Sequence, residues 1–321
     1  LLDGLTANRM PKKDGSITLT HMLNRRGRIE LETTLLRMAE DRYYLVCAAF
    51  FEQRLLDHLQ SARGISPAFA NLFENDLVRV TSVSEDWSAL ALNGPLARDV
   101  LQECTETDLS NTGFRWLSGQ NITVAGHPVW AMRMSYAGEL GWELHMPNAA
   151  CLDVYDALWT AGEAYGIADY GSFAMNALRM EKGFKGAGEL TNEVTLAEAD
   201  VLRFARRDKA FFGSDKTFND DNMPWICAYL EIAPDGQSDG HGGEAVLLND
   251  RVVGATASVA YGPSVGKILA FAYLSPDAAK PGTKLEVLIH GVPRAARVLD
   301  EPAYDPQSLR PRTDVTPQAA E

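Results

Sequence analysis

The sequence has few of the residues that build metal centres and disulfide frameworks. Its six histidines are scattered, without HxxxH or HExxH spacing. Its four cysteines lie far apart and form no CxxC pair: Cys47, Cys104, Cys151 and Cys227. A zinc site or a disulfide scaffold needs closely spaced ligands or paired cysteines. We therefore expect no metal ion, and we interpret the cysteines as buried thiols in a reducing compartment.

Positive charge and long apolar runs are also scarce. The 321 residues carry a formal net charge of −13, which argues against nonspecific binding to nucleic acid or to an anionic membrane. No stretch approaches the ~18 consecutive apolar residues of a membrane span, and no charged-then-apolar leader opens the sequence. We expect a cytoplasmic protein, or one of the mitochondrial matrix if the source is eukaryotic.

The glycine fingerprints of nucleotide and hydrolase sites are missing as well. The stretch "GFKGAGEL" (183–190) lacks GxGxxG spacing and has no preceding strand, and the sequence contains no GxSxG element. Rossmann-type dinucleotide binding and serine-hydrolase chemistry depend on these elements. Neither activity is therefore predicted for this chain.

At 46% hydrophobic residues, the chain can bury a large core. Strands around turns at 24–27 and 41–42, and a hairpin at about 121–146, alternate with helical patterns. The expected helices cover 50–62, the segment after the Gly94–Pro95 break, 148–166 with Asn148 as N-cap, and 172–182. These patterns predict a mixed α/β or an α+β fold for the first ~215 residues.

From about residue 224, short strands are separated by Gly, Pro, Asn and Asp: "WICAYLEIA", "EAVLLND", "RVVGATASVAYG", "ILAFAYL" and "KLEVLIHG". They predict a small antiparallel sheet or barrel. The predicted domains are 1–220, a barrel at 221–310 and a polar tail at 311–321. The first residues, "LLDGL", already follow an apolar pattern, whereas natural termini are usually polar. We therefore expect the sequence to start inside a domain of a longer protein.

The stretch "RMSYAGELGWELH" (133–145) resembles an apolar hairpin that nevertheless carries a carboxylate, Glu143, between Trp142 and Leu144. Strand alternation places Glu143 on the side of His145, where it could be a surface carboxylate paired with Arg133. Alternatively, it is a buried acceptor for two hydrogen bonds from a ligand with a flat amidine edge.

Other charged residues allow two interpretations each. Glu30 and Glu32 share one face of a predicted strand, and we expect this face to be solvated unless it meets a ligand. Arg179 and Glu181 near a helix end favour a structural ion pair. The segment "RFARRDK" (203–209) is either a solvated run or a receiver for the carboxylates of an anionic ligand.

Six stretches in the same order carry a family resemblance: "LTANRMP", "LTHMLNRRGRIELE", "ALNGPLARDVL", "RMSYAGELGWELH", "ALRMEKGFKGAGELT" and "VGATASVAYGPSVGKILAFAYL". The sequence resembles the aminomethyltransferase (glycine cleavage system T protein) family from about residue 1 to 310. It is most similar to the folate-binding C-terminal half of dimethylglycine and sarcosine dehydrogenases. The resemblance implies a three-lobed folate-binding fold with a C-terminal antiparallel β-barrel.

The resemblance also assigns roles to residues. Glu143 matches the carboxylate that binds the amidine edge of the pterin, and Tyr136 matches the aromatic residue at the pterin site. Glu32 stands where the family places an aspartate near the folate nitrogens, which implies a catalytic role as a general base or an electrostatic group. Met175 replaces a folate-contacting arginine. Arg206 and Arg207 are weaker candidates for binding the folate tail.

The implied activity is capture of the one-carbon unit of an N-methyl amine, of dimethylglycine or sarcosine type, on tetrahydrofolate as 5,10-methylenetetrahydrofolate. FAD and oxidation of the amine are expected only in an N-terminal domain or subunit outside this chain.

The alternatives are a free-standing aminomethyltransferase, another folate-dependent demethylase, and an auxiliary domain that no longer binds folate. An iron–sulfur maintenance protein on a similar fold is disfavoured, because Phe184 stands where its motif needs cysteine.

Overall fold

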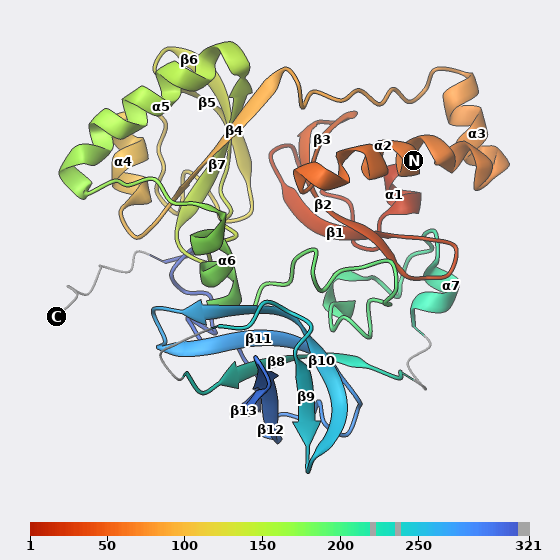
Figure 1. The fold of residues 1–321 in the computed structure, drawn as a ribbon. Coiled ribbons are helices and arrows are strands. Elements are labelled where there is room, and N and C mark those ends of the chain that lie inside the picture. Colours follow the sequence, from red (N-terminus) through yellow and green to blue (C-terminus); the bar gives the residue numbers. More distant parts are fainter. Residues whose placement is uncertain (219–222, 235–238, 314–321) are drawn as a thin grey trace. The chain divides into compact units, whose positions relative to one another are not determined.

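A computed structural model describes residues 1–218, 223–234 and 239–313 of the chain (Figure 1). The chain divides into two compact units, neither of which is continuous in sequence. Unit 1 comprises Leu1–Arg9, Leu19–Thr33 and Ser172–Pro306, and unit 2 comprises Met10–Thr18, Thr34–Gly171 and Gln307–Glu321. The domain boundary predicted at 220/221 and most of the tail predicted at 311–321 lie outside the described residues.

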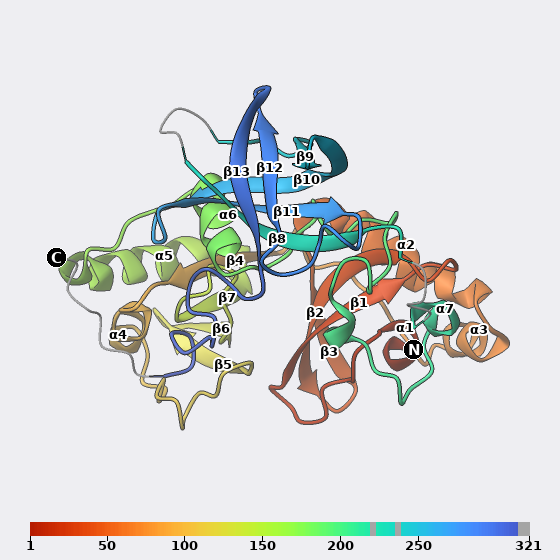
Figure 2. The same cartoon turned by 90° about the horizontal axis from the view of Figure 1, so that it is seen from below.

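Unit 1 contains a closed barrel of six antiparallel strands in the order β10-β11-β8-β13-β12-β9. Figure 2 shows β12 and β13 lying side by side. The strands are β8 (Ile226–Ile232), β9 (Ala245–Leu248), β10 (Arg251–Gly262), β11 (Lys267–Leu274), β12 (Lys284–Ile289) and β13 (Val292–Leu299). Alternate residues point inward and form an aliphatic core, as the pleat of a strand requires. The predicted antiparallel barrel is confirmed.

Outside the barrel, unit 1 has a second small core that contains Leu23, Ile29 and Phe211, and several further elements. They are α1 (Leu2–Leu5), the end of β1 (Ile17–Leu23), the start of β2 (Ile29–Ala39), α6 (Ser172–Glu181), η4 (Leu202–Phe204) and α7 (Ser214–Thr217). Helix α6 packs on β10 and β11 of the barrel and buries Met180 there.

The charges at the end of α6 have partners other than each other. Arg179 forms a buried ion pair with Glu189 at 3.0 Å, and a carboxylate oxygen of Glu181 accepts a hydrogen bond from the Ser264 backbone N–H at 2.6 Å. The expectation of a structural ion pair near this helix end was right for Arg179 and wrong about Glu181 as its partner. The real partners lie outside the helix, where local sequence spacing carries no information.

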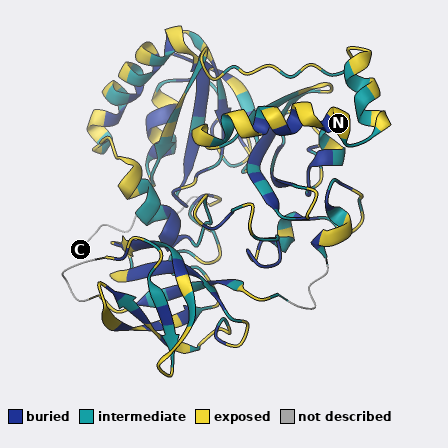
Figure 3. Ribbon diagram, turned by 45° about the vertical axis from the view of Figure 1, so that its right-hand side comes forward, coloured by how far each residue is buried: buried dark blue, intermediate teal, exposed yellow. Residues whose placement is uncertain are grey.

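Unit 2 contains a four-stranded sheet in the order β4-β7-β6-β5. Its strands are β4 (Trp87–Asn93), β5 (Gly119–Val124), β6 (His127–Met132) and β7 (Gly141–Pro147). Helices α4 (Ala97–Glu103) and α5 (Asn148–Gly162) pack on it over a core that includes Trp142, Leu144 and Met146. Helix α5 accordingly carries both buried and exposed positions (Figure 3).

The other elements of unit 2 are the end of β2, β3 (Arg42–Val46), η1 (Ala49–Phe51), α2 (Glu52–Ser61), η2 (Ala62–Gly64), α3 (Pro67–Glu74) and η3 (Glu163–Tyr165). Together with the barrel, this mixture of helices and antiparallel sheets confirms the α+β class. Within the described ranges, no helix is long and apolar enough to cross a membrane.

Two local predictions need correction. The hairpin expected at 133–145 is instead a loop, 133–140, between β6 and β7, so that Met134 and Tyr136 do not lie on a strand. Helix α5 begins at Asn148 itself with Pro147 as its N-cap, because the Asn148 side chain contacts Glu85 and Ser88 and makes no capping bond.

Candidate functional site

Glu143 lies on β7, a central strand of the unit 2 sheet, in register with Ala91 of β4 and Met132 of β6. Trp142 and Leu144 point into the helix-covered core, so Glu143 faces the other side of the sheet. Its side chain is 25% exposed, which is low for a glutamate and leaves it within reach of a ligand.

Arg133 does not support the interpretation of Glu143 as a surface ion pair. The Arg133 guanidinium is buried and donates hydrogen bonds to the Phe114 carbonyl, to Asn111 and, at 3.1 Å, to the Pro311 carbonyl. Its contacts hold the start of the loop 133–140.

Two phenols lie within electrostatic range of Glu143. Burial raises the pKa of Tyr44, on β3, and the negative charge of Glu143 adds to this rise. Burial also raises the pKa of Tyr170, with a further rise from Glu143, while a hydrogen bond of 2.6 Å from Asn93 to its hydroxyl opposes the shift. Both hydroxyls are therefore protonated at neutral pH, and the site combines one carboxylate with neutral aromatic groups.

His145 is the direct contact of Glu143. Its Nε2 lies 3.4 Å from Glu143 Oε2, and its Nδ1 lies 3.3 Å from the Tyr44 hydroxyl. The imidazole is 4% exposed. A buried histidine thus connects the phenol of β3 to the carboxylate of β7.

Tyr136 lies on the loop 133–140 and is 37% exposed. The other end of this loop is held by Arg310, whose Nε lies 2.5 Å from a carboxylate oxygen of Glu139. Gly138 has φ +77°, a conformation that favours glycine. The loop that carries Tyr136 is therefore anchored near both ends, at Arg133 and at Glu139, by residues 310–311 of the same unit.

Glu32 belongs to unit 1, on β2, with a side chain that is 29% exposed. Its Oε1 lies 3.1 Å from Nε2 of His21, whose side chain is fully buried on β1. The His21 ring also packs at 5.7 Å from the ring of Phe204. The face of Glu30 and Glu32 is therefore partly covered and not simply solvated.

Arg206 and Arg207 also belong to unit 1. Arg206 Nε lies 3.7 Å from a carboxylate oxygen of Asp208, which is also bound by Arg9 at 2.5 Å. The Arg207 guanidinium lies over the Phe218 ring at 4.5 Å. In the basic segment 203–209, Asp208 thus partly neutralises Arg206, and Arg207 stacks on an aromatic ring. The role of this segment in binding an anionic tail stays a prediction. Met175 is half-buried on α6.

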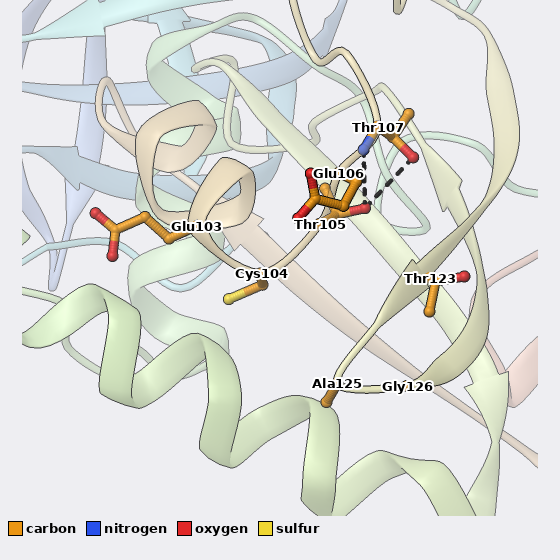
Figure 4. A pocket seen from close by; sticks show the side chains of 8 residues that line it. All are labelled: Glu103, Cys104, Thr105, Glu106, Thr107, Thr123, Ala125 and Gly126. Carbon is orange, nitrogen blue, oxygen red and sulfur yellow. Dashed lines mark hydrogen bonds between the residues drawn. The ribbon is translucent and has the colours of Figure 1, made fainter.

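A cavity of about 490 Å³ lies elsewhere in unit 2, between the end of α4 and the β5–β6 turn (Figure 4). Its lining includes Glu103, Cys104, Thr105 and Glu106, and none of the predicted site residues. Burial, with the neighbouring charge of Glu103, raises the pKa of Cys104, so this thiol is a poor nucleophile at neutral pH.

The structure places Tyr136 and Glu143 in unit 2 and places Glu32, Arg206 and Arg207 in unit 1. Sequence reasoning noted that His145 shares a side with Glu143 but did not assign it a role. It missed Tyr44 and Tyr170, because both are distant in sequence from β7. It also missed the contact of His21 with Glu32, although both belong to one predicted hairpin.

Two family models match the chain: the GCVT N-terminal domain over residues 1–209, and the glycine cleavage T-protein C-terminal barrel domain over residues 227–305. The chain is 32% identical over 317 residues to mitochondrial dimethylglycine dehydrogenase of Mus musculus, covering 97% of this chain and 35% of that protein. It is 27% identical over 308 residues to an aminomethyltransferase of Thermoanaerobacter sp. (strain X514), covering 94% of this chain and 80% of that protein. The crystal structure of glycine cleavage system aminomethyltransferase T from Bartonella henselae has the same fold, with a TM-score of 0.77 at 20% identity over 95% of this chain and 81% of that one.

Proposed function

Because the chain belongs to the glycine cleavage T-protein family of aminomethyltransferases, we propose that it binds a reduced folate and captures a one-carbon unit on it. The observation that carries the proposal is the Glu143 site. A partly buried carboxylate faces away from the core, beside two neutral phenols and a buried histidine.

This arrangement fits the edge of a pterin ring. The ring N–H and the exocyclic amino group of a pterin are two parallel donors, and a carboxylate accepts both in a charge-assisted pair. The exposed Tyr136 supplies an aromatic surface for the ring in this proposal. Arg206 and Arg207 are proposed to receive the carboxylates of the folate tail.

Glu32 is proposed to act as the general base or electrostatic group at the folate nitrogens. A reduced folate, when bound, supplies the two nitrogens, N5 and N10, between which the carbon is held. The Glu32 carboxylate would take up or stabilise the proton that N10 loses as the methylene bridge closes. His21 Nε2 borders this carboxylate at 3.1 Å without forming a hydrogen bond to it.

The source of the carbon is proposed from the relatives. The chain spans 35% of the mouse dimethylglycine dehydrogenase. We propose that it acts within a larger FAD-dependent dehydrogenase, as a domain or subunit. The flavin-binding part would oxidise an N-methyl amine of dimethylglycine or sarcosine type to an electrophilic iminium. In this proposal the iminium carbon is captured as 5,10-methylenetetrahydrofolate, the demethylated amine leaves, and without folate the iminium is hydrolysed to formaldehyde.

A free-standing aminomethyltransferase is the second candidate. It is favoured by the alignment with the Thermoanaerobacter protein, which covers 80% of that protein. Both candidates need folate and differ in the donor of the carbon. Release of ammonia from an aminomethylated lipoyl carrier protein, in the presence of tetrahydrofolate, would support the second candidate over the first.

The ligand class is tested by thermal unfolding with two compounds. A ligand that binds only the folded state raises the unfolding temperature. We expect 5-formyltetrahydrofolate to raise it and p-aminobenzoylglutamate, which has the tail without the pterin, to have little effect. An equal rise with both compounds would place the recognition in the tail and contradict the role of Glu143. No rise with either would contradict folate binding.

A further inference from the structure

Three side chains of unit 2 form a line on the far side of the sheet from its helices. The Tyr44 hydroxyl lies 3.3 Å from Nδ1 of His145, and Nε2 of the same ring lies 3.4 Å from Glu143 Oε2. The Tyr44 and His145 rings meet edge to face, with centroids 5.3 Å apart and planes at 80°. The aromatic packing thus holds the imidazole in the plane that joins both partners.

The order of donors along this line follows from the acceptor-only carboxylate at one end and the protonated phenol of Tyr44 at the other. Its raised pKa keeps the phenol protonated at neutral pH. A neutral imidazole has one N–H donor and one acceptor nitrogen. Because Nε2 faces the Glu143 carboxylate, the ring proton belongs on Nε2, and Nδ1 then accepts from the Tyr44 O–H. Tyr44 therefore supports the tautomer that donates to Glu143.

An anchored carboxylate samples fewer orientations than a free one. The terminal torsion of a glutamate is broad, so an unsupported carboxylate samples many orientations. A contact through Oε2 removes much of this freedom and directs the remaining lone pairs. The two distances are long for hydrogen bonds, and contacts of this kind often tighten only when a ligand is bound.

We propose that His145 is a positioning residue, locked by Tyr44, that orients the Glu143 carboxylate for the two donors of the pterin edge. The inference rests on the proposed function and adds to it a determinant of affinity. His145 does not touch the ligand in this account. It acts through Glu143, in the way that outer-shell partners orient the groups that bind directly.

The first test measures the dissociation constant of 5-formyltetrahydrofolate by calorimetry for parent, His145→Gln, His145→Leu and Tyr44→Phe. His145→Leu removes the donor and should weaken binding about tenfold, the value of one hydrogen bond to a charged group. His145→Gln keeps an N–H near the position of Nε2 and should stay within about threefold of the parent. Tyr44→Phe removes one hydroxyl and leaves the ring packing intact. Its dissociation constant should lie between those of His145→Gln and His145→Leu.

The matched control is His127→Leu. His127 Nε2 contacts Asp153 at 2.7 Å, a pair in the same unit with side chains 34% and 62% exposed. This substitution should leave the affinity unchanged. If His145→Gln loses as much affinity as His145→Leu, or if His127→Leu loses as much, the donor role of His145 is wrong.

A second readout needs no folate. Imidazole ¹⁵N chemical shifts should show His145 as a single tautomer with its proton on Nε2, and Tyr44→Phe should populate both tautomers. A mixture of tautomers in the parent would overturn the inference even if folate binds and the proposed function stands. If the tautomer is fixed but the parent binds no folate, the proposed function fails, and the role of His145 in ligand binding fails with it.

Discussion

Gly141, the first residue of β7, has no room for a side chain. A Cβ at this position would lie 2.2 Å from Asn93 Oδ1 and 2.7 Å from the Leu92 carbonyl oxygen. Strand β4 therefore approaches β7 more closely here than any other residue allows. This close approach places Asn93, and through it the Tyr170 hydroxyl, near Glu143.

We expect Gly141→Ala to lower the free energy of unfolding by about 1–3 kcal/mol, because the backbone must shift to relieve the overlap. Urea unfolding of the parent and the variant measures this difference. Gly64→Ala is the matched control, since a Cβ at Gly64 meets nothing within 4 Å. Equal stability of the Gly141 variant and the parent would contradict the crowding at the start of β7.

Cys227 predicts a dependence of stability on pH. Burial raises the pKa of this thiol from 9.0 to about 12. As the pH rises above 9, the thiol of the unfolded chain loses its proton while the folded chain keeps it. The unfolded state is therefore favoured progressively, and stability falls between pH 9 and about 12.

Cys227→Ala should remove this contribution. Alanine leaves a cavity, so the variant is less stable at neutral pH, but its stability should decline less steeply between about pH 8 and pH 10. Urea midpoints at the two pH values measure the slope. Parallel slopes for parent and variant would contradict the raised pKa.

The residues of the Glu143 site differ in how far the sequence could indicate them. Strand alternation indicated that Glu143 and His145 share a side, because a period of two is a property of the strand alone. Tyr44 could not be found in this way. It lies about a hundred residues earlier in the chain, and only the packing of β3 beside β7 brings it to His145.

At the level of elements, the segment 307–313 anchors the loop 133–140. Arg310 pairs with Glu139, and the Pro311 carbonyl accepts a hydrogen bond from Arg133. The side chain of Arg310 is 28% exposed and that of Glu139 is 15% exposed. This pair is more sheltered than an ordinary surface ion pair and holds the loop that carries Tyr136.

We expect Arg310→Ala to increase amide hydrogen exchange in residues 134–140. Without the ion pair to Glu139, local opening of the loop costs less free energy. The control is Arg312→Ala, because the Arg312 side chain donates hydrogen bonds to the Ser308 and Gln307 carbonyls of its own segment. Exchange measured by mass spectrometry distinguishes the two variants. Unchanged protection of the loop in Arg310→Ala would show that the ion pair does not hold it.

Most elements could be predicted, and the misses have physical causes. Strands β8 to β12 and helices α2, α5 and α6 have clear periodicity and were expected. Strand β13 was not, because Pro293 takes an outward position and the charged Arg294 takes a buried one, which obscures the alternation. The hairpin at 133–145 was misplaced because the alternation of Met134 and Tyr136 belongs to a loop whose anchors come from residues 310–311.

At the scale of the whole molecule, neither compact unit is a single continuous stretch of the sequence. Unit 1 takes its residues from three separate segments, and so does unit 2. The predicted boundary at 220/221 lies outside the described residues and stays a prediction. The proposed folate residues are accordingly divided between the units, with Glu143 in one and Glu32 in the other.

The central claim concerns Glu143 as the acceptor of the pterin edge, and calorimetric titration of the parent and Glu143→Gln with 5-formyltetrahydrofolate tests it most directly. An amide presents an N–H₂ group to one of the two donors, so we expect binding to weaken at least about tenfold, as for loss of a hydrogen bond to a charged group. Glu103→Gln, at the cavity outside the site, should bind like the parent. Equal affinities of the parent and Glu143→Gln would contradict the account.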